Sequence, residues 1–74
     1  MALRVCPVDS CDLRIFDEHV MCRAHWRMVP AEMQTAVWRA FHQHEARRED
    51  RNRLNALRQA QAAAVRAVNE KVAA

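Results

Sequence analysis

Apolar residues recur at intervals of three or four along most of the chain that follows Pro30. The chain has no glycine, and no proline follows that position, so no residue there interrupts a helix. Residues spaced in this way fall on one face of an α-helix, which predicts an amphipathic helix over residues 30–47. Proline suits the first position of a helix, which places the start at Pro30. The apolar face of this predicted helix consists of Met33, Val37, Ala40, Phe41 and His44, with Ala36 widening it.

A second and stronger helical pattern predicts a helix over residues 50–73. Its apolar stripe consists of Leu54, Leu57, Gln61, Val65, Val68 and Val72. Alanines beside the stripe let another helix approach closely, and nothing larger than valine lies on it after Leu57. This helix therefore needs a partner. That partner is either the helix over 30–47, folded back as a hairpin, or the same helix from a second copy of the chain.

Residues 42–53 join the two stripes and contain no large apolar side chain. Glu45 and Arg48 stand three residues apart, a spacing at which opposite charges attract on a helix surface. The segment is either the solvated middle of one continuous helix or a polar bend, in which Asp50 or Asn52 caps the second helix.

Residues 1–29 lack this periodicity and predict a short knuckle of strand and loop. Leu13, Ile15 and Phe16 form a small apolar cluster that predicts one strand or a hairpin arm. The expected fold class is therefore mainly α. A knuckle over 1–29 precedes a helical region over 30–74, and the two make one folding unit.

Four residues of the knuckle form a pattern typical of a zinc site. Cys6, Cys11, Cys22 and His25 follow the spacing C-x4-C-x10-C-x2-H. Zn²⁺ favours tetrahedral sites built from thiolate and imidazole, and a Cys₃His set closes such a site. A chain of 74 residues has a small core, and a structural metal is a common way to stabilise one. The sequence therefore predicts one structural Zn²⁺ as cofactor.

Other interpretations of this region stay open. Asp9, Asp12 and His19 are alternative ligands, and His25 is preferred over His19 because its spacing from Cys22 is tight. The three cysteines could instead be unrelated buried thiols. Trp26, which follows His25, is expected to cover the metal site and exclude water.

Cysteine usage and hydropathy predict a cytoplasmic location. Three cysteines are an odd number, which a disulfide framework cannot fully use. The residues before Cys6 lack the apolar region of a signal peptide, and no apolar run approaches the length of a membrane span. We expect no membrane association. We also expect no catalysis, because four protein ligands leave no open position on the metal for water.

Charge is uneven along the chain. Residues 1–37 carry four arginines against five acids, a net charge of −1. Residues 38–74 carry seven arginines and one lysine against four acids, a net charge of +4. This surplus supports one alternative function, a nucleic-acid-binding zinc-finger regulator that uses the arginine-rich segment 39–58 against phosphate. The arginines concerned are Arg39, Arg47, Arg48, Arg51, Arg53 and Arg58.

The leading function is that of a small interaction protein whose helices bind a protein partner. The basic surplus is modest, and an alanine-rich helix suits pairing better than it suits an enzyme scaffold. The partner is expected to be another protein, a second copy of this chain, or both. The residues expected to contact it are Trp38, Phe41, Leu54, Leu57, Val65 and Val68.

The run from Met21 to Pro30 resembles a family of small phage and prophage proteins. Its sequence is MCRAHWRMVP, and these zinc-finger-like proteins share an MC-x2-HW-x2-VP block downstream of a cysteine pair. Similarity extends over residues 6–41, although many members have C-x2-C where this chain has C-x4-C. The resemblance implies a phage origin and action inside the infected or lysogenic bacterium, but the family has no agreed activity and supplies no target. A host protein is the partner expected for the leading function. The resemblance also implies that Cys6, Cys11, Cys22 and His25 hold the metal.

Overall fold

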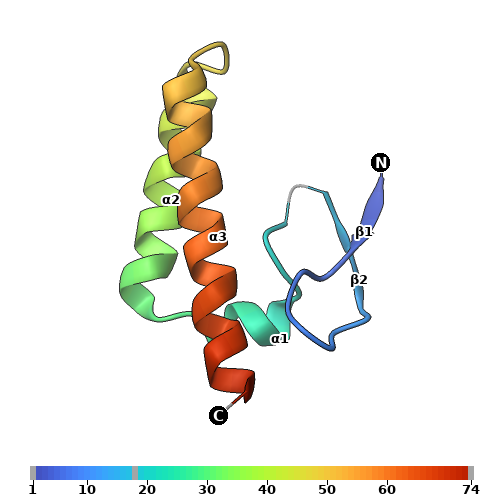
Figure 1. Ribbon diagram of the computed structural model, residues 1–74. Helices are drawn as coiled ribbons and strands as arrows, with labels where there is room; N and C mark the ends of the chain where they lie inside the picture. The colour runs from blue at the N-terminus through green and yellow to red at the C-terminus, as the bar shows by residue number, and fades with distance from the viewer. Residues whose placement is uncertain (1, 18, 74) are drawn as a thin grey trace.

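Two long helices lie side by side as an antiparallel hairpin, and a small two-stranded sheet lies beside one half of it (Figure 1). This computed structural model describes residues 2–17 and 19–73. The elements in chain order are β1 (Leu3–Val5), β2 (Arg14–Phe16), α1 (Arg23–Trp26), α2 (Ala31–Ala46) and α3 (Arg51–Ala73). The prediction of a mainly α fold behind a small N-terminal knuckle is confirmed. Within the described residues, no helix is long and apolar enough to cross a membrane.

The sheet of the knuckle is a single antiparallel pair, β1 and β2. In its register Leu3 faces Phe16, and Arg4 faces Ile15. Alternate side chains point to opposite faces of a strand, so Ile15 is buried while Phe16 is exposed. The apolar cluster at 13–16 predicted the strand β2, whereas nothing in the sequence singled out its partner β1.

The two long helices are separate, and residues 47–50 form the turn between them. The side chain of Asp50 caps α3, because its Oδ1 accepts hydrogen bonds from the backbone N–H groups of Asn52 at 2.9 Å and Arg53 at 3.4 Å. The Arg53 guanidinium also donates to the carbonyl of Gln43 at 2.9 Å, which ties the start of α3 to the end of α2. The polar bend is therefore the alternative that the structure adopts.

The buried residues of α3 lie partly on the predicted stripe and partly beside it. Ala64 and Val68 are fully buried, and Leu57 is buried with them. Val65 is only half-buried, and Val72 remains 44% exposed. The buried face therefore combines Leu57 and Val68 of the stripe with the small side chain of Ala64 beside it.

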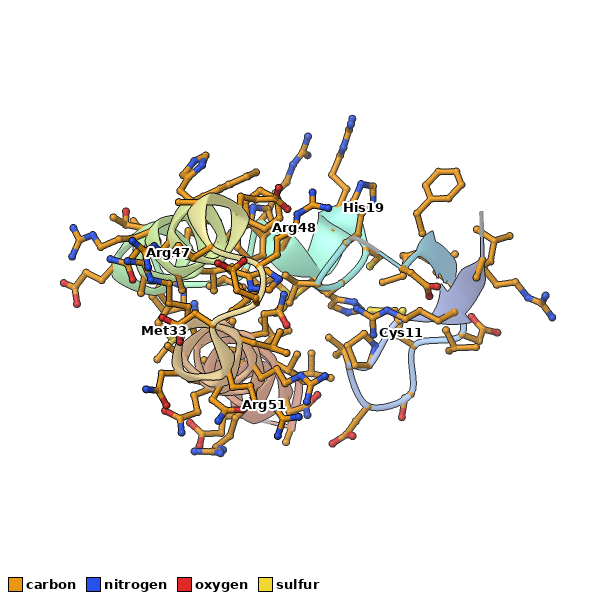
Figure 2. All side chains as sticks on the ribbon, turned by 90° about the horizontal axis from the view of Figure 1, so that it is seen from above. Cys11, His19, Met33, Arg47, Arg48 and Arg51 are labelled. Atoms are coloured by element: carbon orange, nitrogen blue, oxygen red, sulfur yellow. The ribbon has the colours of Figure 1, made fainter. Side chains whose placement is uncertain are left out.

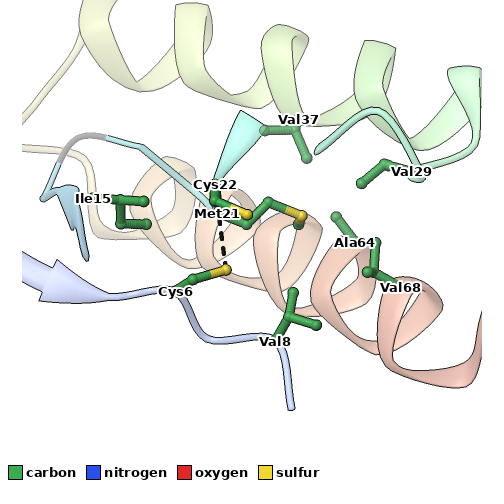
Figure 3. Close-up of a cluster of buried hydrophobic side chains, with 9 residues drawn as sticks. All are labelled: Cys6, Val8, Ile15, Met21, Cys22, Val29, Val37, Ala64 and Val68. Atoms are coloured by element: carbon green, nitrogen blue, oxygen red, sulfur yellow. Dashed lines mark hydrogen bonds between the residues drawn. The ribbon is translucent and has the colours of Figure 1, made fainter. Parts of the chain in front are cut away.

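A single core joins the knuckle to the hairpin (Figure 3). Buried side chains of the knuckle contact buried side chains of both long helices. The cluster consists of Cys6, Val8, Ile15, Met21, Cys22, Val29, Val37, Ala64 and Val68. Two of its members are cysteines of the predicted metal site, so the site lies within the core that holds the molecule together.

Two hydrogen bonds fasten the C-terminal part of α3 to the knuckle. The Oδ1 atom of Asn69 accepts a hydrogen bond from the backbone N–H of Asp9 at 2.8 Å. The Nζ atom of Lys71 donates to the backbone carbonyl of Met28 at 2.6 Å. These contacts span 60 and 43 residues of sequence, and they fix the position of the knuckle along the hairpin.

Candidate metal centre

Four side chains of the knuckle converge on one point. The ligand atoms of Cys6, Cys11, Cys22 and His25 all lie within 4.8 Å of one another. Cys6 and Cys22 are buried, and Cys11 and His25 are half-buried. The structure therefore brings together the whole predicted ligand set, in an arrangement that suits one bound metal ion.

A tight loop after β1 positions the first two thiols. The backbone N–H of Cys6 donates to the carbonyl of Leu13 at 2.8 Å, which closes the loop at its base. The N–H of Cys11 donates to the carbonyl of Val8 at 3.1 Å, forming a turn. Ser10 lies in this turn with a φ of 65°, in the left-handed region of backbone conformation. The turn brings Cys11 back towards Cys6.

The second pair of ligands lies at the short helix α1. Cys22 precedes the helix with an extended backbone, and its carbonyl accepts a hydrogen bond from the N–H of Trp26 at 2.9 Å. His25 follows three residues later, so both side chains point to the same side of the first turn. The Nδ1 atom of His25 lies 3.1 Å from the Sγ of Cys22 and 3.8 Å from the Sγ of Cys6.

The spacing of these atoms fits a tetrahedral zinc site. Zn–S bonds of about 2.3 Å and Zn–N bonds of about 2.0 Å place neighbouring ligand atoms roughly 3.5–3.8 Å apart in a regular tetrahedron. The distances of 3.1 and 3.8 Å at His25 bracket that value. The upper limit of 4.8 Å for the whole set lies within about 1 Å of it. It is Nδ1 of His25 that faces the sulfur atoms.

The surroundings of Cys6 and Cys11 shift the pKa values of these two thiols in opposite directions. Burial raises the pKa of the Cys6 thiol, but hydrogen bonds with the backbone of Cys22 and Val8 and with His25 outweigh it and lower the pKa to about 7. A backbone hydrogen bond lowers the pKa of Cys11, but burial and the sulfur atoms of Cys6 and Cys22 outweigh it and leave the pKa raised. A thiolate at Cys6 thus makes deprotonation of the neighbouring Cys11 thiol less favourable. A divalent cation at the centre removes this conflict, because coordination deprotonates a thiol.

The alternative ligands lie outside the cluster. Among the described residues, the group that could hold a metal contains none of the three alternatives, Asp9, Asp12 and His19. His19 is exposed, its ring lies edge-on to Phe16, and its backbone carbonyl accepts a hydrogen bond from Arg4. Figure 2 shows His19 projecting on a different side of the knuckle from Cys11. The preference for His25 over His19 therefore agrees with the geometry.

The six residues expected to contact a partner occupy quite different environments. Trp38 is 54% exposed, and its ring meets that of Phe41 edge-on with the ring centres 6.0 Å apart. Leu57 and Val68 are buried inside the molecule, so neither is accessible to a partner in this structure. Phe41, Leu54 and Val65 are half-buried. The hairpin accounts for this difference, because the apolar stripe of α3 packs within the chain.

A groove of about 480 Å³ lies between the knuckle and α2. Met21 and Trp26 line it from the knuckle, and Val37, Trp38 and Phe41 line it from α2. Sequence reasoning missed this groove, because its two walls are distant in the chain and meet only when the knuckle docks on the hairpin. The one available signal was Gln61, a polar residue within an apolar stripe, which also lines the groove.

Comparison with protein-family models, curated proteins and solved structures yields no match. The class of the protein therefore rests on its own geometry, that of a small helical hairpin carrying a Cys₃His cluster suited to one metal ion.

Proposed function

We propose that this protein is a small zinc-stabilised interaction module. In this proposal Zn²⁺ held by Cys6, Cys11, Cys22 and His25 keeps the knuckle folded against the hairpin, and the module binds a protein partner. The observation that carries the proposal is the convergence of these four ligand atoms within 4.8 Å. Four protein donors complete a tetrahedral shell, so the proposed role of the metal is structural rather than catalytic.

Zinc explains how so small a knuckle remains folded. Its sheet has two strands of three residues each, and its helix α1 has four residues. A two-stranded sheet is marginally stable by itself in water. Structural Zn²⁺ contributes roughly 10 kcal/mol or more of apparent binding free energy in small fingers, which is enough to offset the ordering of these segments.

The metal proposal is tested by native mass spectrometry of the protein purified without added metal. We expect one Zn²⁺ per chain, lost on treatment with EDTA. Replacing the metal with Co²⁺ should give the visible absorption of a tetrahedral site with three sulfur ligands. The variants His25→Ala and His19→Ala form a matched pair: the first should lose the metal and the second should keep it. Equal metal content in the two variants would contradict the ligand set.

The proposal of a protein partner rests on Trp38. Tryptophan is among the residues that contribute most at protein interfaces, and here it is largely exposed beside the half-buried Phe41. The resemblance of the MCRAHWRMVP run to phage and prophage proteins supports a phage origin, and for a protein of that origin we propose a host protein as the partner. Capture of a host protein by the zinc-loaded chain should survive about 200 mM salt and be lost in Trp38→Ala. If binding of the captured molecule disappears at that salt concentration, the proposal of a protein partner is contradicted.

Nucleic-acid binding is the competing function, and the turn of the hairpin is where it would act. Arg47, Arg48 and Arg51 surround this turn in the view along the hairpin (Figure 2). Arg48 is already paired with Glu45 at 2.7 Å, which leaves less positive charge for phosphate. Binding of a duplex or single strand that falls steeply between about 50 and 200 mM salt would establish this function in place of the first.

A further inference from the structure

The groove between the knuckle and α2 has the form of a recognition site. Its volume of about 480 Å³ lies in the range of ligand pockets, and its walls are mostly apolar and aromatic. Trp26 forms part of one wall, and Trp38 and Phe41 form part of the other. The ring of Trp38 is held edge-on by Phe41 and stacked on His42 with an interplanar angle of 26°. An ordered aromatic ring at the edge of a groove loses little freedom when it contacts a ligand.

Among the described residues that line the groove, Arg23 carries the one formal charge, and that charge is positive. Arg23 and His19 line the groove from the knuckle, and no residue of its lining within the described chain carries a carboxylate. Arg23 is exposed and takes part in no ion pair with the described residues. An acidic group on a ligand would therefore find a free guanidinium at this position, which suits bidentate contact with a carboxylate.

Gln61 provides a further polar contact. It is half-buried on α3, lines the groove, and makes no side-chain hydrogen bond to any residue that the structure describes. Its amide offers both a donor and an acceptor, as does each peptide unit of a polypeptide backbone. A polar residue within an otherwise apolar stripe is thus explained if a peptide covers it.

We propose that this groove binds a short acidic peptide segment of the partner, with one large apolar side chain inserted between Trp38 and the knuckle. A carboxylate next to that anchor meets Arg23, and the peptide backbone meets Gln61. This inference rests on the proposed interaction function and names the surface and the chemistry of the partner. A peptide fits better than a nucleic-acid strand, because Arg23 is the only arginine or lysine among the described lining residues and phosphate contacts need several such cations.

The groove should also depend on the metal. Met21, Arg23 and Trp26 line one wall, and they lie beside or between the ligands Cys22 and His25. Loss of the metal releases the segment that carries this wall, while the α2 wall can remain helical. We therefore expect chelation of zinc to abolish peptide binding even where much of the helicity survives.

The test selects binders to the full-length zinc-loaded protein from a random peptide library. The affinity of an enriched peptide is then measured by titration of its labelled form with the protein. We expect enriched peptides to combine an aromatic or long aliphatic residue with adjacent Asp or Glu. Trp38→Ala should weaken binding about tenfold or more, as is usual for a central interface residue. Leu13→Ala is the matched control, since Leu13 is 56% exposed and does not line the groove.

Two further variants separate the polar contributions without altering the core. Arg23→Glu should weaken the acidic peptide and favour the same peptide with Lys in place of its acids, whereas Arg66→Glu on the exposed surface of α3 should do neither. Gln61→Leu should weaken binding while leaving the hairpin intact, because leucine suits both the helix and the apolar stripe.

The outcomes distinguish the groove from the wider function. Enriched peptides that bind equally well to Trp38→Ala overturn the groove but leave the interaction function standing. If the enriched peptides are basic, or if a thymidine oligonucleotide displaces the peptide, the proposal that the groove binds an acidic peptide is wrong. A folded, zinc-loaded protein that enriches no peptide overturns the groove. If that protein also captures no protein partner, the proposed interaction function fails as well.

Discussion

The loop between the first two cysteines contains a residue in an unfavourable backbone conformation. Ser10 has a φ of 65°, which glycine adopts freely but which other L-residues adopt at a cost of roughly 1–2 kcal/mol. We expect Ser10→Gly to raise the free energy of unfolding of the zinc-loaded protein by up to about 1 kcal/mol, since greater freedom in the unfolded chain offsets part of the gain. Chemical denaturation measures this. Ser10→Val should destabilise, and equal stability of the two variants would contradict the turn geometry.

A second residue-scale prediction concerns the start of α3. Asp50 accepts two backbone hydrogen bonds there, and its replacement by alanine should lower the free energy of unfolding by about 1 kcal/mol. Glu49→Ala is the control, because Glu49 is exposed in the turn and caps no helix. Thermal melts of the two variants give the comparison. A cap that contributes nothing would leave their melting temperatures equal.

At this scale the sequence predicted that the four candidate ligands would cluster, but it did not predict their surroundings. Cys22 and His25 are three residues apart, so one helical turn suffices to place both on the same side. Cys6 and Cys11 likewise meet across a short local loop. The environment of Gln61 is different, because its position in the groove depends on a knuckle that lies about forty residues earlier in the chain. The spacing of apolar residues along one helix does not predict which distant segment of the chain packs beside it.

At the scale of elements, helical spacing predicted both long helices to within one residue at each end. The predicted ranges 30–47 and 50–73 became 31–46 and 51–73. Spacing alone left open whether they were one helix or two, and the cap formed by Asp50 accounts for the break. β1 went unnoticed because its three residues, Leu3–Val5, are too few for their alternation of apolar and polar side chains to be distinctive. That strand is ordered by pairing with β2 rather than by its own sequence.

The packing of α3 against α2 leads to a prediction at Ala64. This side chain is fully buried, so there is no space for a larger one. Ala64→Leu should destabilise the protein by about 1–3 kcal/mol through overpacking. Ala62→Leu makes the same chemical change at an exposed position two residues away, and should have little effect on stability. Denaturant unfolding distinguishes the two, and a tolerated leucine at Ala64 would mean that the buried face of α3 lies elsewhere.

At the scale of the whole molecule, the metal site and the hairpin are not independent. Cys6 and Cys22 belong to the same buried cluster as Ala64 and Val68 of α3. Metal-linked folding transmits binding free energy to whatever packs against the ligands. Zinc should therefore stabilise the C-terminal half of α3 as well as the knuckle, while the half near the turn depends mainly on contacts with α2.

This coupling predicts where removal of zinc acts on the hairpin. On addition of EDTA, backbone amides from Ala64 to Asn69 should exchange hydrogen faster, together with those of the knuckle. Amides around Leu57 should change less, because the cluster that contains the two cysteines does not include Leu57.

The variant Asn69→Ala removes the hydrogen bond from the N–H of Asp9 to the Asn69 side chain. In the zinc-loaded protein it should therefore also make the α3 amides from Ala64 to Asn69 exchange faster, although less than EDTA does. If neither EDTA nor the Asn69 variant changes the hydrogen-exchange rates of the α3 amides, the knuckle and the hairpin fold separately. The metal-dependent groove between them would then be lost as well, because its two walls would no longer hold each other in place.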